Sequence, residues 1–196
     1  MSRHLIVPVV EGHGEVEAVP LLVRRIYAEL LPDVTVVVNH PIRVKSGSFV
    51  SDELYFRRYV AMAAAKAAQG NGLVLILLDC EDDCPADLGP KLLAGAKSVR
   101  PDVPSMVVLA HREYETWFLA AAESLDMGLA PPDNPEAIRG AKEWLTRRMA
   151  VPYDPIIHQA SFTSKFDLRQ AQRIPSFARL VRKVTCGNLP SMSGQN

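Results

Sequence analysis

The chain has 196 residues, 48% of them hydrophobic, and its 22 basic and 22 acidic side chains give a formal net charge of zero. This length suits one domain, or one domain with a small extension, and the apolar content argues against a disordered chain. No apolar run approaches the roughly 20 residues that span a bilayer, and the first residues lack a signal-peptide pattern. The three cysteines form neither a disulfide framework nor a CxxC pair, so we expect a cytoplasmic protein without membrane contact.

The charges are unevenly distributed along the chain. Residues 1–133 contain 12 Lys and Arg against 18 Asp and Glu, a balance of −6, whereas residues 134–196 contain 10 against 4, a balance of +6. A basic segment is a common footprint of a polyanionic partner. Basic side chains also simply solvate helix faces, and the sequence leaves both interpretations open.

Strand and helix patterns alternate along the first two thirds of the chain. Strands are predicted at residues 4–10, 34–38, 73–78 and 105–109, and helices at residues 15–31, 52–69, 87–99 and 114–125. Residues 40–51 contain Pro41, Gly47 and three serines, and are expected to form an exposed loop. The alternation predicts an α/β fold with about four mainly parallel strands flanked by helices.

The last third of the chain has a different character. A proline-rich break at residues 127–135 is followed by three shorter helical patterns near residues 136–149, 165–173 and 175–185. We therefore expect an α/β domain at residues 1–130 and a small, basic helical extension packed on it at residues 131–186. Residues 187–196 are expected to be a disordered tail.

Carboxylates follow three of the apolar runs, where buried strands are expected to end. They are Glu11 after the first strand, Asp79, Glu81, Asp82 and Asp83 after the third, and Glu113 and Glu115 after the fourth. Open α/β sheets bind ligands at the carboxyl edge, and clustered carboxylates repel one another unless a cation lies between them. Hard cations prefer oxygen ligands. The pattern therefore predicts a site for Mg²⁺ or Mn²⁺.

Other interpretations of these motifs are less informative. A solvated acidic loop would account for the cluster after Asp79, and Glu15 and Glu17 suit the first turn of a helix. EGHGEVE lacks the third glycine of the dinucleotide fingerprint, and Cys80 and Cys84 lack a further Cys/His pair for a soft metal. The chain also has no P-loop, GxSxG or HExxH motif. Any chemistry is therefore expected from carboxylates and a metal.

The three acidic motifs, in this order on a βα alternation, resemble the Toprim domain. That domain is shared by topoisomerases, primases, recombination mediators and nucleases of the overcoming-lysogenization-defect (OLD) family. Its glutamate after the first strand corresponds to Glu11 in VVEGHGE, and its DxD motif to Asp79 and Glu81 in LLDCEDD. Because Glu81 replaces the second aspartate, Asp82 and Asp83 are alternative ligands.

A closer resemblance extends along nearly the whole chain. The chain is similar to the DUF4276 family of Toprim-like proteins in EGHGEVEAVPLLVRRI, LLDCEDDCPADLG, HREYETWFLAA, AKEWL and FDLRQAQRIPSFARLVRKV. Proteins of this family are regarded as relatives of the OLD-type nucleases, and some accompany ATPases in anti-phage systems. The resemblance implies a Toprim-like α/β fold with a helical C-terminal extension.

The resemblance also implies a metal-dependent phosphodiesterase, most simply a DNA nuclease of an anti-phage or DNA-repair system. Glu11 would be its general base or acid, Asp79 with Glu81 or Asp83 would hold Mg²⁺ or Mn²⁺, and Glu113 or Glu115 would complete a second metal shell. The basic residues expected to contact DNA phosphates are Arg147, Arg148, Lys165, Arg169 and Arg173.

Two alternatives remain beside the nuclease. One is a non-catalytic metal-binding regulatory or interaction subunit that needs a partner ATPase, and the low net charge favours it. The other is a hydrolase of a small phosphorylated molecule. The sequence does not decide between a monomer and a homodimer.

Overall fold

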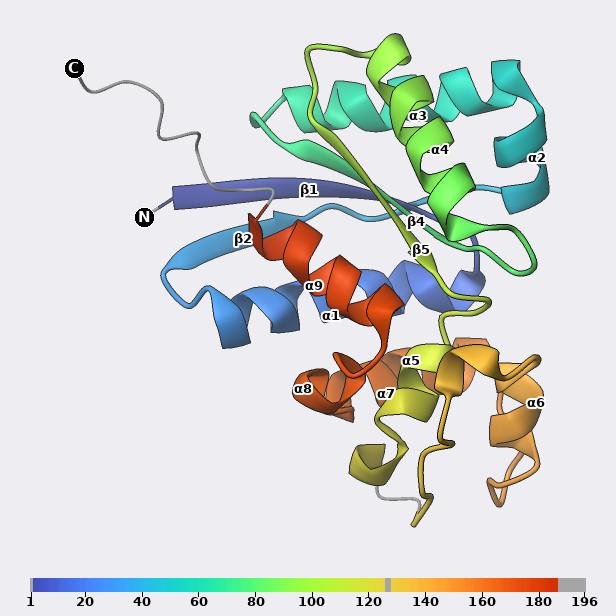
Figure 1. Cartoon of the computed structure of the whole chain (residues 1–196). Helices are drawn as coiled ribbons and strands as arrows, with labels where there is room; N and C mark the ends of the chain where they lie inside the picture. Colours follow the sequence, from blue (N-terminus) through green and yellow to red (C-terminus); the bar gives the residue numbers. More distant parts are fainter. Residues whose placement is uncertain (1, 126–127, 187–196) are drawn as a thin grey trace.

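The computed structural model describes residues 2–125 and 128–186. Its centre is a sheet in the order β2-β1-β4-β5, with a short strand β3 also beside β1 (Figure 1). The strands are β1 (Ser2–Val10), β2 (Val34–Val38), β3 (Ile42–Arg43), β4 (Leu73–Asp79) and β5 (Ser105–Ala110). All pairings between these strands are parallel. The carboxyl ends of the strands therefore lie at one common edge.

Helices cover both faces of this sheet. On one face lie α2 (Ser46–Ser51), α3 (Glu53–Ala68) and α4 (Pro85–Val99), and on the other α1 (His13–Leu30) and α9 (Pro175–Cys186) (Figure 1). The remaining pieces lie below the sheet in this view. They are α5 (Thr116–Ala120), η1 (Ala122–Leu125), η2 (Pro135–Ala137), α6 (Ala141–Thr146), η3 (Pro155–Gln159), α7 (Ala160–Lys165) and α8 (Leu168–Ala171).

Strand β4 explains why the sheet edge carries the polar residues. Val74, Ile76 and Leu78 pack with α3 and α4, while the leucines between them pack with α1 and α9. A parallel strand that is buried on both faces needs a continuous apolar sequence. Asp79 ends this run, and it is the first residue of β4 that is not fully buried.

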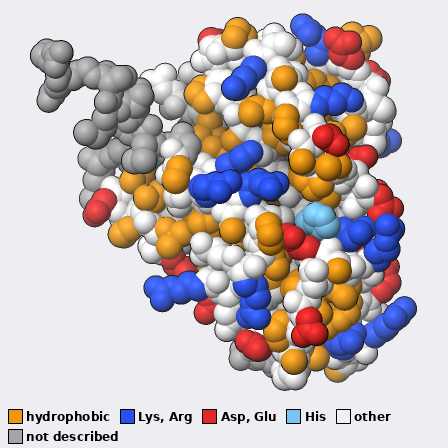
Figure 2. Space-filling view, in the orientation of Figure 1, with side chains coloured by type: hydrophobic (Ala, Val, Ile, Leu, Met, Phe, Trp, Pro, Cys, Tyr) orange, Lys and Arg blue, Asp and Glu red, His pale blue; other side chains and the backbone are white. Residues whose placement is uncertain are grey.

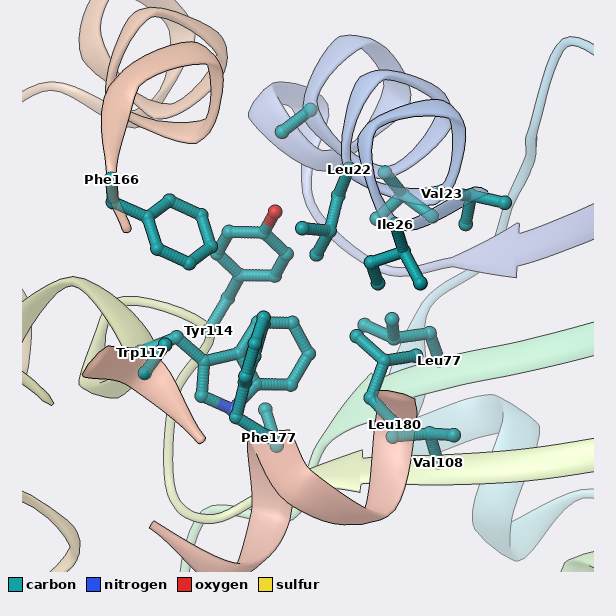
Figure 3. Close-up of a cluster of buried hydrophobic side chains, with 14 of the residues drawn as sticks. Leu22, Val23, Ile26, Leu77, Val108, Tyr114, Trp117, Phe166, Phe177 and Leu180 are labelled. Carbon is teal, nitrogen blue, oxygen red and sulfur yellow. The ribbon is translucent and has the colours of Figure 1, made fainter. Parts of the chain in front are cut away.

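An aromatic cluster packs the segment after β5 against α9, which lies on the same face of the sheet as α1. The ring of Trp117 lies 4.6 Å from that of Tyr114 and 5.2 Å from that of Phe177 in α9 (Figure 3). Trp117 Nε1 also donates a hydrogen bond to Ser176 Oγ at 3.0 Å. These contacts join the segment after β5 to α9.

The domain boundary at residue 130 stays a prediction, and the predicted tail at residues 187–196 lies outside the described residues.

The α/β class predicted from sequence, with parallel strands flanked by helices, is confirmed. The exposed loop expected at residues 40–51 is wrong, because this segment forms β3 and α2. Ile42, Val44 and Phe49 are buried there, and the ring of Phe49 packs 4.8 Å from that of Phe56 in α3. Its apolar side chains outweigh the proline, glycine and serines that suggested a loop.

Of the helices predicted after β5, the last, near residues 175–185, is confirmed by α9, whereas the others are shorter in the structure. Residues 114–125 contain the five-residue α5 and the 3-10 helix η1, and residues 136–149 contain only α6 beside η2. η3 and most of α7, before the pattern expected at residue 165, were missed. Pro155 begins η3, where the Asp154 side chain accepts the N–H of Ile156. None of the helices in the described ranges is both long and apolar enough to cross a bilayer.

Candidate functional site

Two turns at the carboxyl edge of the sheet hold each other in place. The N–H of Glu81 donates to the carbonyl of Arg112 at 3.0 Å, and the N–H of Arg112 donates to Cys80 Sγ at 3.3 Å. Glu81 has φ 47° and Arg112 has φ 67°, a left-handed conformation that non-glycine residues rarely adopt. Such conformations persist where the surrounding structure fixes them, and they are found preferentially at functional sites.

Asp79 lies at the base of these turns. Its Oδ1 accepts the N–H of Tyr114 at 2.8 Å. Burial, followed by the negative charges of Glu15 and Glu115, raises the pKa of Asp79 well above its ordinary value. A positive charge brought close to Asp79 would favour its charged form.

Glu11 approaches this position from the neighbouring strand. Val9 of β1 pairs with Ile76 of β4, so Glu11 lies beside the last residues of β4. Glu11 Oε1 accepts a hydrogen bond from Ser46 Oγ of α2. Glu11 Oε2 is buried and has no hydrogen-bond partner among the described residues. One oxygen of this carboxylate is thus free for a further ligand or a proton.

Glu15 belongs to the site, which the sequence interpretation did not anticipate. It does lie in the first turn of α1, as expected, and its Oε2 accepts the N–H of Glu11 at 3.0 Å. However, Glu15 is only 3% exposed. Burial raises its pKa to about 7, although the N–H groups of Glu11 and Gly12 act in the opposite direction. The available signal was its spacing, because Glu15 precedes the buried Ala18 and Val19 by three and four positions.

Glu115 is fully buried and has partners from the last third of the chain. Its Oε1 accepts hydrogen bonds from the hydroxyl of Tyr153 at 3.0 Å and from Gln159 Nε2 at 3.4 Å. Its Oε2 lies 3.6 Å from Lys142 Nζ. Burial raises the pKa of Glu115, and Lys142 partly offsets this effect. The REYETWF motif indicated Glu115, but no local pattern marked its three partners.

Lys142 brings a positive charge to this group of carboxylates from the first turn of α6. Its Nζ lies 3.7 Å from Glu113 Oε2, and Glu113 also accepts the N–H groups of Ala141 and Lys142 at 3.2 and 3.3 Å. Burial on its own lowers the pKa of Lys142, but Glu115, Asp79 and Glu113 raise it overall. Lys142 therefore stays protonated.

The acidic residues that follow β4 have three different environments. Glu81 is exposed and lines a cleft of about 330 Å³, which Asp79 also lines. The Asp82 carboxylate lies 2.8 Å from the guanidinium groups of both Arg139 and Arg112, which lower its pKa. Asp83 is exposed and is not among the residues that line this cleft.

The basic residues expected to contact nucleic acid are all exposed, but only some adjoin this cleft. Arg147 and Arg148 line a second cleft, of about 460 Å³, which shares Glu113 and Arg139 with the first. The Arg148 guanidinium lies 4.0 Å from the ring centroid of Trp144. The other three residues lie at or beyond the end of α7 and line neither cleft; they are Lys165, Arg169 and Arg173.

The donor atoms suit a hard cation in their chemistry. Among the residues of the two described ranges, no three Asp, Glu, His or Cys side chains form a group that could hold a metal ion. Mg²⁺ usually binds through one or two carboxylates, with water and substrate phosphates as its other ligands. Asp79, with Glu81 on the same cleft, fits that mode. Glu113 and Glu115 instead contact Lys142.

Comparison with known proteins places the chain in a family. A family model described as a domain of unknown function, DUF4276, matches residues 10–185. The chain belongs to the DUF4276 family. This DUF4276 protein is similar to a solved structure, the C-terminal region of the Burkholderia pseudomallei OLD protein, with 15% identity and a TM-score of 0.42. That likeness covers 93% of this chain and 97% of the other. No curated protein matches the sequence.

Proposed function

We propose that this DUF4276 protein is a divalent-cation-dependent phosphodiesterase that acts on nucleic acid, with DNA as its substrate. The observation that carries the proposal is an excess of buried and half-buried acid around one ammonium group. The acids are Glu11, Glu15, Asp79, Glu113 and Glu115, and the ammonium belongs to Lys142. Burial, and after it the neighbouring negative charges, raise the pKa values of Glu15, Asp79 and Glu115, and a divalent cation beside these carboxylates would favour their charged forms.

The residues of the site can be given distinct roles in phosphodiester hydrolysis. A bound Mg²⁺ or Mn²⁺ would stabilise negative charge on the phosphate and lower the pKa of a water molecule. Asp79 and Glu81 would hold that cation at the cleft. Glu11 would accept a proton from the attacking water at its unpaired Oε2.

Lys142 would act on the phosphate as a fixed positive charge. Its ammonium lies within 4 Å of both Glu113 and Glu115, so it is oriented before substrate arrives. Preoriented charges stabilise developing negative charge without reorganisation during the reaction. In this proposal Glu113 and Glu115 position Lys142. This role takes the place of the one expected from the sequence, in which they complete a second metal shell.

The shape and charge of the two clefts favour a polymeric substrate over a small phosphorylated molecule. The cleft of Asp79 adjoins the cleft lined by Arg147 and Arg148, and Arg139 lines both. Arginines along such a path suit consecutive phosphates of a nucleic-acid backbone, which they contact without reading sequence.

The test is cleavage of plasmid and single-stranded DNA with Mg²⁺, Mn²⁺ or EDTA by the wild type, Asp79→Asn and Asp33→Asn. Asp33 is an exposed acid just before β2, at the amino edge of the sheet. Asp33→Asn is therefore a control that removes the same charge far from the candidate site. Metal-dependent cleavage that is lost only in Asp79→Asn would support the proposal. If folded wild-type protein binds Mn²⁺ but cleaves no DNA, the proposal fails, and a subunit that requires a partner ATPase becomes the better explanation.

A further inference from the structure

A second basic surface lies on α9, apart from Arg147, Arg148, Lys165, Arg169 and Arg173. Strand β5 forms one edge of the sheet, and α9, which lies in front of the sheet in Figure 1, packs against this strand. Lys183 Nζ donates a hydrogen bond to the carbonyl of Val107 in β5 at 2.7 Å. Figure 2 shows Lys and Arg side chains gathered in the middle of this face, over α9 and β5.

Three positively charged side chains on this surface form no ion pair with a carboxylate of the described residues. Within residues 2–125 and 128–186, no ion pair joins Arg179, Arg182 or Lys183 to an acidic side chain. Burial, followed by the positive charges of Arg179 and Arg182, lowers the pKa of Lys183. The three side chains therefore repel one another, and a bound anion would relieve that repulsion.

The same three residues line a hollow of about 280 Å³ between α9 and α4. Its apolar lining includes Leu93 and Leu109. Positive groups beside an apolar surface suit a phosphate attached to a larger, partly apolar unit such as a sugar. A nucleic-acid backbone offers that combination at every nucleotide.

The position of this hollow connects it with the candidate site. Its lining includes Pro85, which comes shortly after the acidic turn of Glu81 and Asp82, and Leu109, which comes shortly before the turn of Arg112. Those turns form the rim of the cleft that contains Asp79. A strand that lies in the hollow would thus reach the rim of that cleft.

We propose that the surface of Arg179, Arg182 and Lys183 binds the phosphate backbone of DNA. This inference rests on the proposed function and identifies a contact region for its substrate. Phosphate contacts of this kind do not depend on DNA sequence, and each one contributes about −0.9 to the slope of log affinity against log salt on duplex DNA.

The test measures binding separately from cleavage. A fluorescent DNA duplex is titrated with protein in EDTA at several KCl concentrations, and its anisotropy is recorded. Arg179→Gln/Arg182→Gln is compared with Arg57→Gln/Arg58→Gln, which removes the same charge from exposed positions on α3. Lys183 is left unchanged because it bonds to β5.

We expect the α9 variant to lose about tenfold in affinity at low salt and to have a salt slope smaller by about two. The α3 variant should bind like the wild type. Arg179→Lys/Arg182→Lys, which keeps both charges, should restore most of the affinity. Equal affinities and slopes for the α9 and α3 variants would overturn the proposal, as would wild-type protein that binds no DNA.

These outcomes can be separated from those of the cleavage experiment. DNA that is bound through α9 but is never cleaved would contradict the phosphodiesterase and leave the binding surface in place. DNA that is cleaved normally, while the α9 variant binds as tightly as the α3 variant, would refute the surface and leave the phosphodiesterase.

Discussion

Lys142 Nζ lies 3.6 Å from the Oε2 atom of Glu115, a residue without exposed surface. The pair joins α6 to the segment between β5 and α5, because Glu115 directly precedes α5 and Lys142 lies in the first turn of α6. A buried charge that loses its partner is strongly destabilising, whereas replacing both partners by neutral groups is often tolerated. The pair is therefore open to a double-mutant test.

Lys142→Met should lower the free energy of unfolding by about 2 kcal/mol. This is less than the roughly 3–5 kcal/mol found for a fully buried pair, because the Lys142 side chain is 39% exposed. Adding Glu115→Gln should recover most of the loss, since the remaining carboxamide can still accept from Tyr153. Urea unfolding in EDTA measures both effects. Additive losses in the double variant would mean that the two charges do not interact.

Stability without metal should fall as pH rises, partly because of Glu15. Its folded pKa of about 7 lies above its ordinary value of 4.5, so the folded state binds the proton more tightly than the unfolded state. The stabilisation that protonated Glu15 contributes to the folded state is fully present below pH 4.5 and is lost as pH rises through 7. Its upper limit is on the order of 3 kcal/mol.

Glu15→Gln should reduce this pH dependence, as measured by thermal unfolding in EDTA between pH 5 and pH 8. Glu17→Gln is the matched control, because Glu17 lies on the exposed side of the same helix turn. Equal pH profiles for the two variants would show that Glu15 titrates normally. Asp79 and Glu115 have raised pKa values as well, so some dependence of the same sign should persist.

Gly14→Ala should destabilise the protein by about 1–3 kcal/mol. A Cβ at Gly14 would overlap Gln159 Oε1 and the backbone carbonyl of Pro155, and backbone cannot move aside easily. Gly47→Ala is the control, because nothing lies within 4 Å of a Cβ at that helical position. There the lower entropy of the unfolded chain should make the change neutral or slightly stabilising. Denaturant midpoints for the two variants would test the difference.

The sequence predicted the α/β layers because their signals are local. The apolar run of β4 and the acid that ends it can be recognised without knowledge of the rest of the chain. The partners of Glu115 could not be predicted this way, since Lys142, Tyr153 and Gln159 reach it through tertiary packing across irregular segments. Glu15 could be predicted in part. The sequence pattern places it on the apolar stripe of α1, but its charge favoured an interpretation as a surface residue.

The acidic turn after β4 allows a test of which carboxylate contributes to the proposed cation site. Glu81→Gln should weaken Mn²⁺ binding at least about tenfold, since even a group that only supports a metal ligand contributes that much, and Glu81 lines the cleft of Asp79. Asp83→Asn removes the same charge two residues away, outside the lining of that cleft, and should change the affinity less than twofold. Calorimetric titration with Mn²⁺ would distinguish them. A larger effect at Asp83 would assign the ligand to that residue instead.

The close contact of Gly14 with η3 has a consequence for protein synthesis. Domains fold progressively as the chain leaves the ribosome. The turn that follows β1 emerges early, yet its neighbours Pro155 and Gln159 emerge more than 140 residues later. Until then the cluster around Glu115 lacks its lysine, tyrosine and glutamine partners. The complete cluster can therefore form only after most of the chain has been translated.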